Sequence, residues 1–245
     1  MGTKSELVHK LQQDILLWQG FKPASACKDE RIGLGGIEDA FPGGVFPKRA
    51  IHEFITVFPE DAAASDGFIA GLLSALMQDG AACVWISTAR RLFPASLRSF
   101  NVEPERIIFM DVATEKDALW IMEEALRCEG LAAVVAEVDA LSLIESRRLQ
   151  LAVEESGVTG FILRKDARRM ASTIATARWQ ISPLPSVLEE GMPGLGFPRW
   201  QVELLKVRNG IPGNWIMEWA GEGFLEVKRV LQQDGWREDD SRQIG

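Results

Sequence analysis

Short apolar, β-prone runs alternate with longer stretches of helical periodicity through the middle of this chain. The apolar runs lie at 50–57, 81–87, 106–110, 131–138 and 160–163, and the helix-like stretches between them at 62–78, 92–100, 116–128 and 141–156. Such alternation is typical of a parallel sheet whose strands are joined by covering helices. The run 131–138 is almost wholly apolar, which predicts a central strand buried on both faces. We therefore expect an α/β domain with five parallel strands.

Beyond residue 178 the apolar positions repeat every two residues, which is the periodicity of a strand. The repeat is clearest at 199–207 and 214–219, and the pair Asn209-Gly210 between them is a strong turn signal for a β-hairpin. We therefore expect the sheet to end antiparallel. The last segment, 228–245, is mostly polar around a single large apolar residue, Trp236, and predicts a flexible tail.

The first 20 residues predict an amphipathic helix. Thr3 and Glu6 form a capping box, Gly20 provides a stop, and the apolar residues between them recur at helical spacing. The apolar stripe consists of Leu7, Leu11, Ile15 and Trp18. A stripe of this kind either packs against the helix's own domain or docks on a partner, and both interpretations stay open.

The segment 21–48 holds glycines and prolines at a density that excludes long regular elements. We expect it to be a connector outside the core. The chain thus divides into an amphipathic helix at 1–20, the connector at 21–48, a core at 49–227 and the polar tail at 228–245.

Composition narrows the classes of protein that this chain can be. A hydrophobic content of 47% with 25% charged residues is ordinary for a globular domain, and no apolar stretch reaches the roughly 18 residues of a membrane-spanning helix. The N-terminus lacks the apolar region of a signal peptide, so we expect a cytoplasmic protein. A net charge of −8 argues against binding of a phosphate backbone over the whole surface.

No constellation of metal-binding or nucleophilic residues stands out in the sequence. The three cysteines are far apart and have no CxxC spacing, which predicts reduced thiols and no zinc site. Neither His9 nor His52 has a Ser, Cys or metal-ligand partner at a useful spacing. The sequence therefore predicts no catalytic residue, no metal and no cofactor.

The segment after the first β-prone run has the position of a phosphate-binding loop but not its residues. Such a loop cradles phosphate with main-chain amides and one Lys, in the motif GxxxxGK[ST]. This chain has no such motif there and places Glu60, Asp61 and Asp66 near the expected phosphate. Carboxylates repel phosphate, and the bulky Val57 and Phe58 hinder close approach of the backbone. We therefore expect neither binding nor hydrolysis of ATP.

Several stretches resemble RecA in the same order along the chain. The glycine-rich segment 35–53 resembles the entry to the RecA core, and 117–128, 133–141 and 147–157 resemble a helix, the metal-site strand and the helix that follows it. More narrowly, DALWIMEEALRC, SRRLQLAVEESGVTGF and PRWQVELLKVRNGIPGNW are similar to ImuA, the RecA-like accessory family of the ImuA–ImuB mutagenesis cassette. The resemblance implies a RecA-like fold, with a mostly parallel sheet flanked by helices, an antiparallel C-terminal hairpin and a degenerate P-loop.

The departures from RecA concern its chemistry. The residues around 89–91 lack the catalytic carboxylate that RecA keeps after its second strand. Glu137, with Asp139 nearby, has the position of the Mg²⁺ carboxylate, but a single acid without phosphates holds Mg²⁺ poorly. We therefore expect Glu137 to be a structural remnant that is paired with a cation or solvated.

The resemblance to ImuA implies a non-catalytic adaptor in error-prone lesion bypass after DNA damage. Its partners would be ImuB, a Y-family-like protein, together with RecA and an error-prone C-family DNA polymerase. In RecA the N-terminal helix docks on the neighbouring protomer, which makes the stripe at 7–18 a candidate partner surface. Two other functions stay open, a SulA-like cell-division inhibitor and an ATPase with an unorthodox nucleotide site.

A basic cluster lies where the second DNA-binding loop of RecA would begin. It consists of Arg164, Lys165, Arg168 and Arg169. The cluster either contacts DNA or a polymerase, or forms a solvated helix face.

Overall fold

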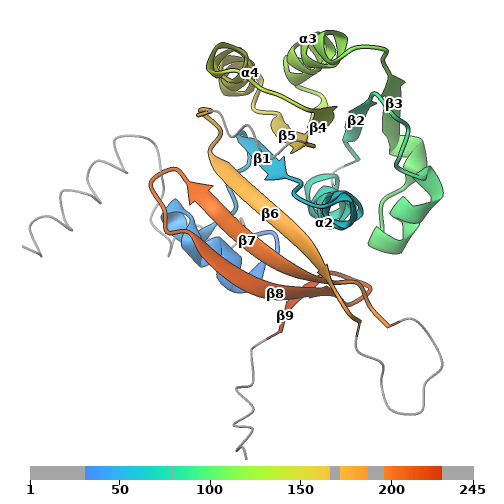
Figure 1. Cartoon of the computed structure of the whole chain (residues 1–245), viewed down its shortest axis with the longest axis vertical. Helices are drawn as coiled ribbons and strands as arrows, with labels where there is room; N and C mark the ends of the chain where they lie inside the picture. Colours follow the sequence, from blue (N-terminus) through green and yellow to red (C-terminus); the bar gives the residue numbers. More distant parts are fainter. Residues whose placement is uncertain (1–30, 79, 166–171, 187–195, 228–245) are drawn as a thin grey trace, which may run out of the picture.

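The computed structural model describes residues 31–78, 80–165, 172–186 and 196–227, and these form one nine-stranded sheet with helices on both faces (Figure 1). The strand order is β3-β2-β4-β5-β1-β6-β7-β8-β9. The strands are β1 (Ile51–Ile55), β2 (Ala82–Ser87), β3 (Ile107–Asp111), β4 (Leu131–Val138), β5 (Thr159–Arg164), β6 (Ala177–Leu184), β7 (Arg199–Val207), β8 (Gly213–Trp219) and β9 (Phe224–Glu226). The helices are α2 (Pro59–Leu76), α3 (Glu115–Leu126) and α4 (Leu143–Ser156), with 3-10 helices η3 (Gly35–Ala40), η4 (Pro42–Gly44), η5 (Pro94–Phe100) and η6 (Pro104–Arg106).

The expected parallel sheet and C-terminal hairpin are both confirmed. The five predicted strands, β1 to β5, pair in parallel, and β7 pairs antiparallel with β8 across the turn at Asn209. In β4 the side chains of Val134 and Val135 are fully buried, and they belong to the cores on opposite faces of the sheet. β4 is therefore the doubly buried central strand that its apolar run predicts.

The sequence pattern missed two strands and misjudged one helix. β6 extends the parallel set, because it pairs in parallel with β1, and β9 adds a short edge beyond β8. The helical stretch expected at 92–100 is only the 3-10 helix η5, which Pro94 begins and which ends at Asn101 in the left-handed conformation. The sheet is thus mixed, with β6 as the strand that changes from parallel to antiparallel pairing.

Two separate cores lie on the two faces of the sheet. α3 and α4 lie side by side over one face, and their core is aliphatic (Figure 1). α2 covers the other face together with the segment 31–48, and this core is rich in aromatic rings. Each strand of the parallel set therefore contributes alternate side chains to two differently built interiors.

The expectation that 21–48 lies outside the core is wrong for its described part. Leu34, Ile37, Phe41 and Phe46 are buried in the aromatic core. The segment indeed has no long regular element, only η3 and η4, but its short turns place these side chains against the sheet. Glu38 stabilises the start of this segment, since its buried carboxylate accepts hydrogen bonds from the amides of residues 32 and 34.

Some expectations fall on residues that the structure does not describe. The stripe Leu7, Leu11, Ile15 and Trp18 lies outside the described residues, and so does the tail at 228–245. Among the helices that are described, none has the length and apolar character needed to cross a membrane.

Candidate functional site at the carboxyl edge of the sheet

The loops that follow the parallel strands meet at the carboxyl edge of the sheet, where open α/β folds bind their ligands. The loop between β1 and α2 comprises only residues 56–58, because α2 begins at Pro59. A phosphate-binding loop needs two glycines with four residues between them before its Lys. The loop here is therefore too short for that cradle, and Glu60 and Asp61 belong to the first turn of α2 instead of the loop.

The amides of this loop are already bound by a carboxylate of the chain itself. Asp61 is buried, and its Oδ2 accepts hydrogen bonds from the amides of Val57 at 3.2 Å and Phe58 at 3.1 Å. A helix N-terminus attracts anions because its free N–H groups and the helix dipole both favour negative charge. Asp61 thus fills, with its own carboxylate, the place where a phosphate would bind. Pro59 at the first helical position with an acid two residues later was the sequence signal for this helix start.

Glu137 lies at the end of β4 and pairs with cations, as expected of a structural remnant. Its Oε2 is 3.4 Å from Lys165 Nζ and 3.9 Å from Arg91 Nε, and Trp85 Nε1 donates to its Oε1 at 3.5 Å. Lys165 also donates to Thr88 Oγ1 at 3.2 Å. These contacts connect the loops after β2 and β5 with the end of β4.

Asp66 on α2 adds a second acid beside this cluster. Burial and, to a smaller extent, the charge of Glu137 raise the pKa of Asp66 to about 7, although Arg91 and Lys165 act in the opposite direction. Near neutral pH this carboxyl therefore holds a proton for part of the time. A bound phosphate would place more negative charge next to Asp66 and Glu137, which opposes nucleotide binding here.

Exposed aromatic side chains surround this edge. Two hollows of about 350 and 460 Å³ share Arg91, Leu92 and Phe93 in their walls. Phe93 is 71% exposed, and Phe58 and Phe109 are also exposed at the carboxyl edge. Exposed aromatic clusters of this kind mark surfaces that contact other proteins.

Arg164, the first member of the predicted basic cluster, is buried and does not lie at the surface. Arg164 is only 1% exposed, because it ends β5 facing Glu53 on β1, whose Oε1 accepts its hydrogen bond at 2.7 Å. Arg178 and Thr173 donate to the other oxygen of Glu53, at 2.7 and 3.0 Å. The expectation that Arg164 belongs to a surface cluster is therefore wrong, and it is not available to a partner.

The other three members of the predicted basic cluster are Lys165, Arg168 and Arg169. Lys165 lies at the surface but is held by Glu137 and Thr88. Arg168 and Arg169 lie outside the described residues. A DNA or polymerase contact by these residues stays a prediction.

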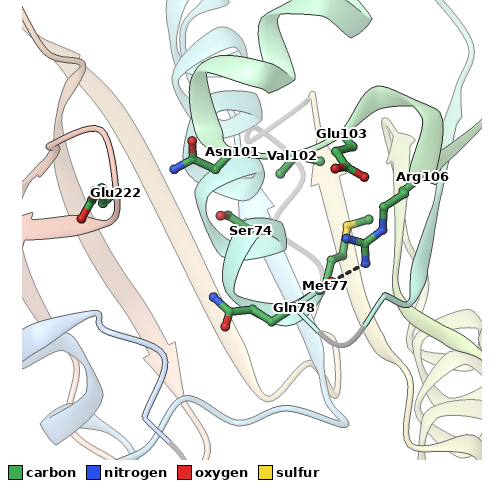
Figure 2. Close-up of a pocket in the computed structure, with 8 residues that line it drawn as sticks. All are labelled: Ser74, Met77, Gln78, Asn101, Val102, Glu103, Arg106 and Glu222. Carbon is green, nitrogen blue, oxygen red and sulfur yellow. Dashed lines mark hydrogen bonds between the residues drawn. The ribbon is translucent and has the colours of Figure 1, made fainter.

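A further hollow, of about 310 Å³, lies at the C-terminal end of α2 (Figure 2). Its polar groups hold the fold together. Arg106 donates to the carbonyl oxygens of Met77 and Ala81, and Asn101 donates to that of Gly221 at 2.6 Å. No group of three or more His, Cys, Asp or Glu that could hold a metal exists in the part of the chain that the structure describes.

Comparison with known proteins gives a clear sequence relative and a fold. No protein-family model matches the chain. It is 34% identical over 231 residues to "Protein ImuA" of Caulobacter vibrioides, in each of two strains, NA1000 and ATCC 19089, and the match covers 87% of this chain and 95% of that protein. Among solved structures it is similar to the RadB recombinase, with a TM-score of 0.53 and 14% identity over 76% of this chain and 94% of that one. The second likeness supports the RecA-like fold alone.

Proposed function

This chain belongs to the ImuA family, and from that membership we propose that it is a non-catalytic RecA-like adaptor in the mutagenesis that follows DNA damage. In this role it acts in the cytoplasm during the SOS response and serves translesion synthesis. It links ImuB, RecA and an error-prone C-family DNA polymerase. Its contribution is a fixed docking shape and not a chemical step.

The observation that carries this proposal is the occupied nucleotide position. Asp61 takes the loop amides, and Glu137 is bound by Lys165, so the loops of the carboxyl edge are held together by the chain's own side chains. A chain that connects them internally has one shape with or without ATP, which suits a scaffold.

The exposed aromatic residues at the same edge support a protein-binding role. Phe93 exposes most of its ring, although burial of an aromatic side chain would be strongly favourable. Aromatic residues, phenylalanine included, are enriched in the cores of protein interfaces relative to the rest of the surface. We therefore place one partner contact at this edge.

The first test is nucleotide binding, measured as thermal stability with and without millimolar Mg-ATP. A ligand at 100 times its Kd adds about 2.7 kcal/mol to the free energy of unfolding, which a melting curve readily detects. We expect no shift, and no phosphate release. A clear rise in Tm, lost on substitution within residues 56–61, would favour the unorthodox ATPase and contradict the proposal.

The second test is direct binding to purified ImuB, RecA and the C-family polymerase, measured by surface plasmon resonance. We expect at least one to bind, and Phe93→Ala to weaken that binding by about tenfold, as for a hot-spot aromatic residue. Ile211→Ala is the matched control, because Ile211 is an equally exposed apolar residue on the turn between β7 and β8. If the folded protein binds none of the three, it is not this adaptor.

A further inference from the structure

One edge of the sheet, the strand β3, has an outer side with which none of the described residues pairs. The strand order begins with β3, and its only neighbour in the sheet is β2 (Figure 1). Among the described elements, β2 is also the only one that packs extensively against it. An edge strand exposes backbone N–H and C=O groups that a further strand can bind. The outer side of β3 is therefore a candidate interaction surface.

The other edge of the sheet, β9, is protected in a way that β3 is not. β9 has only three residues, η3 packs against it, and its Glu226 accepts a hydrogen bond from the amide of Gly36 at 2.7 Å. β3, with the sequence IIFMD, contains neither Pro nor Lys and pairs with β2 without a bulge. Short length, cover, Pro, Lys and bulges are the features that keep an edge from pairing. Among these, β3 has only its modest length.

The pairing with β2 shows which backbone groups of β3 point outward. The amide of Val112, directly after the strand, donates to the carbonyl of Ser87 on β2 at 3.1 Å. The N–H and C=O of a strand residue point to the same side, and successive residues alternate. The even-numbered residues of β3 therefore bond to β2, and the odd-numbered residues direct their backbone groups away from it.

The odd-numbered residues leave a defined set of backbone groups open. The amide of Ile107 is already used, because it donates to the carbonyl of Pro104. The carbonyl of Ile107, the amide and carbonyl of Phe109 and the amide of Asp111 have no hydrogen-bond partner among the described residues. The open groups are thus arranged around Phe109, the central residue of the strand.

Two copies of β3 can satisfy these groups in one another. In an antiparallel pair centred on Phe109, its amide and carbonyl bond to the carbonyl and amide of Phe109 in the second copy. Two residues further along, the amide of Asp111 donates to the carbonyl of Ile107 in the other copy. The contact is the same seen from either copy, as in a two-fold homodimer. A foreign strand would need its own free groups at these positions, whereas a second copy supplies them by symmetry.

The side chains of β3 suit this pairing on both faces of the sheet. Ile108 is 53% exposed and Phe109 is 37% exposed, and as neighbours in a strand they point to opposite faces. The register places the two Phe109 rings directly opposite each other and Ile108 opposite Met110 of the second copy. Aromatic and aliphatic pairs across two strands stabilise a sheet. Apolar side chains that are exposed in one copy are thus covered in two.

The charges of β3 do not oppose this contact. Its one charged residue, Asp111, pairs with Arg90 at 2.6 Å. In the proposed register Asp111 lies opposite the apolar Ile107 of the second copy. Like charges therefore do not face each other along the two strands, although like charges directly opposite would destabilise a pair.

We propose that this protein forms a two-fold dimer in which the β3 strands of two copies pair antiparallel about Phe109. The two sheets then form one continuous sheet. The dimer goes beyond the proposed adaptor function and does not depend on it. One short strand from each copy makes a small interface, which predicts a dissociation constant on the order of 10 μM.

The first test is the mass of the full chain, measured by sedimentation velocity between about 1 and about 100 μM. A dimer of the expected affinity should change from mostly monomer to mostly dimer over this range. A monomer at every concentration overturns the proposal.

Phe109→Lys and Phe109→Asp test where the two-fold axis lies. Each variant alone places two like charges opposite each other, so each should stay monomeric up to about 100 μM. An equimolar mixture places opposite charges across the axis and should form the dimer again. Melting curves of the separate variants show that they are folded. A dimer of either folded variant alone, or no dimer in the mixture, refutes this pairing.

Ile108→Lys is a milder variant, because more than half of this side chain is exposed. A Lys on an edge strand disfavours pairing without disturbing the bonds to β2, so the dissociation constant should rise by at least about tenfold. The matched control is Ile211→Lys, at a residue that is 75% exposed on the turn between β7 and β8, and it should dimerise as the parent does. Equal dissociation constants for Ile108→Lys and the parent place the contact elsewhere and refute the proposal.

The dimer and the adaptor function fail in different ways. If the parent is monomeric but Phe109→Lys stops ImuB, RecA or the polymerase from binding, β3 takes a strand of a partner protein and the dimer is refuted. If the parent dimerises with the expected pattern of variants but binds none of the three proteins, the dimer stands and the adaptor function is refuted.

Discussion

The two faces of this sheet are filled by different chemistry. The face under α2 and residues 31–48 is packed with rings, and the face under α3 and α4 has no aromatic residue among its described core members. The buried rings are Phe41, Phe46, Phe54, Phe68, Trp85, Phe161, Trp179, Trp200 and Trp219. Two regular helices cover the aliphatic face, whereas one helix, α2, and the short 3-10 helices η3 and η4 cover the aromatic face. The rings are therefore found on the face that is partly covered by short turns.

The polar groups buried on the two faces differ as well. His52 and Glu53 are neighbours on β1, so they point to opposite faces. His52 stacks on Phe46, with ring centroids 4.4 Å apart, and is held neutral. The carboxylate of Glu53 forms ion pairs with Arg164 and Arg178, both at 2.7 Å. The aromatic face therefore buries one neutral polar ring, whereas the other face buries a carboxylate that is paired with two arginines.

The largest expected effect tests whether both faces are truly closed to water. Val134→Asp places a charge in the aliphatic core and Val135→Asp places one in the aromatic core. Each buries an unpaired carboxylate at a cost of several kcal/mol, which should prevent soluble folding. Soluble yield and circular dichroism measure this, with the exposed Ile144→Asp as the folded control. A cooperative melt for either buried variant would show that its face is open.

A smaller difference is expected when each core loses one large side chain. Trp179→Ala should lower the free energy of unfolding by about 3–5 kcal/mol, and Met122→Ala by about 2–5 kcal/mol. The loss should therefore be at least as large for the tryptophan variant as for the methionine variant. Trp179 lies 5.9 Å from Phe54 and 5.7 Å from Phe41 between ring centroids, and these contacts are lost together. Urea denaturation measures both. A larger loss at Met122 would mean that the rings are loosely packed.

The smallest effect is a pH dependence that only the aromatic face should show. Burial lowers the pKa of His52 to about 4 from 6.5, although its hydrogen bond to the Pro47 carbonyl opposes this. The unfolded chain gains a proton near pH 6.5 and the folded protein only near pH 4. The contribution of His52 to the stability is therefore complete above pH 6.5, and about 3 kcal/mol of it is lost as the pH falls to 4. Asp66 acts in the opposite direction over the same range, because its pKa in the folded protein is raised to about 7.

The control for this prediction is His52→Asn, measured by urea denaturation between pH 7 and 4. His52 Nδ1 accepts from Trp179 Nε1 at 3.3 Å, and an amide can replace that acceptor without titrating. The contribution of Asp66 is common to both proteins, so the stability of the variant relative to the parent should rise as the pH falls from 6.5 to 4. Parallel curves for the two proteins would mean that His52 is already solvated in the fold.

Local patterns predicted the elements whose signals are local. β4 follows from an almost wholly apolar run, and α4 from the helix-like stretch 141–156. In the structure α4 begins with a capping box of Ser142 and Glu145, which the sequence analysis did not use. The missing phosphate-binding residues were likewise visible in the sequence. That Asp61 takes the place of the phosphate was not predicted, because it depends on where α2 begins.

Distant contacts explain what the sequence did not reveal. β6 contains the charged Arg178 and has Pro183 near its end, so its sequence does not indicate a buried strand. In the structure Glu53 pairs with Arg178 and makes the burial possible. Arg164 resembled a surface cation for the same reason. Likewise, the glycines of residues 31–48 predicted irregular backbone correctly, but not that five apolar side chains of this segment enter the core. Each error concerns a residue whose partner is far away in the sequence.

The position of β1 between β5 and β6 also determines how late in synthesis β1 can pair with its neighbours. The bonds from Glu53 to Arg164 and Arg178 span 111 and 125 residues. A ribosome that adds about 5–20 residues per second needs roughly 6–25 s to pass from β1 to β6. Throughout that interval the apolar β1 has neither of its neighbours and is exposed to aggregation or to chaperones. The strand order thus fixes a minimum length, near the end of β6, below which β1 of a growing chain cannot pair with both of its neighbours.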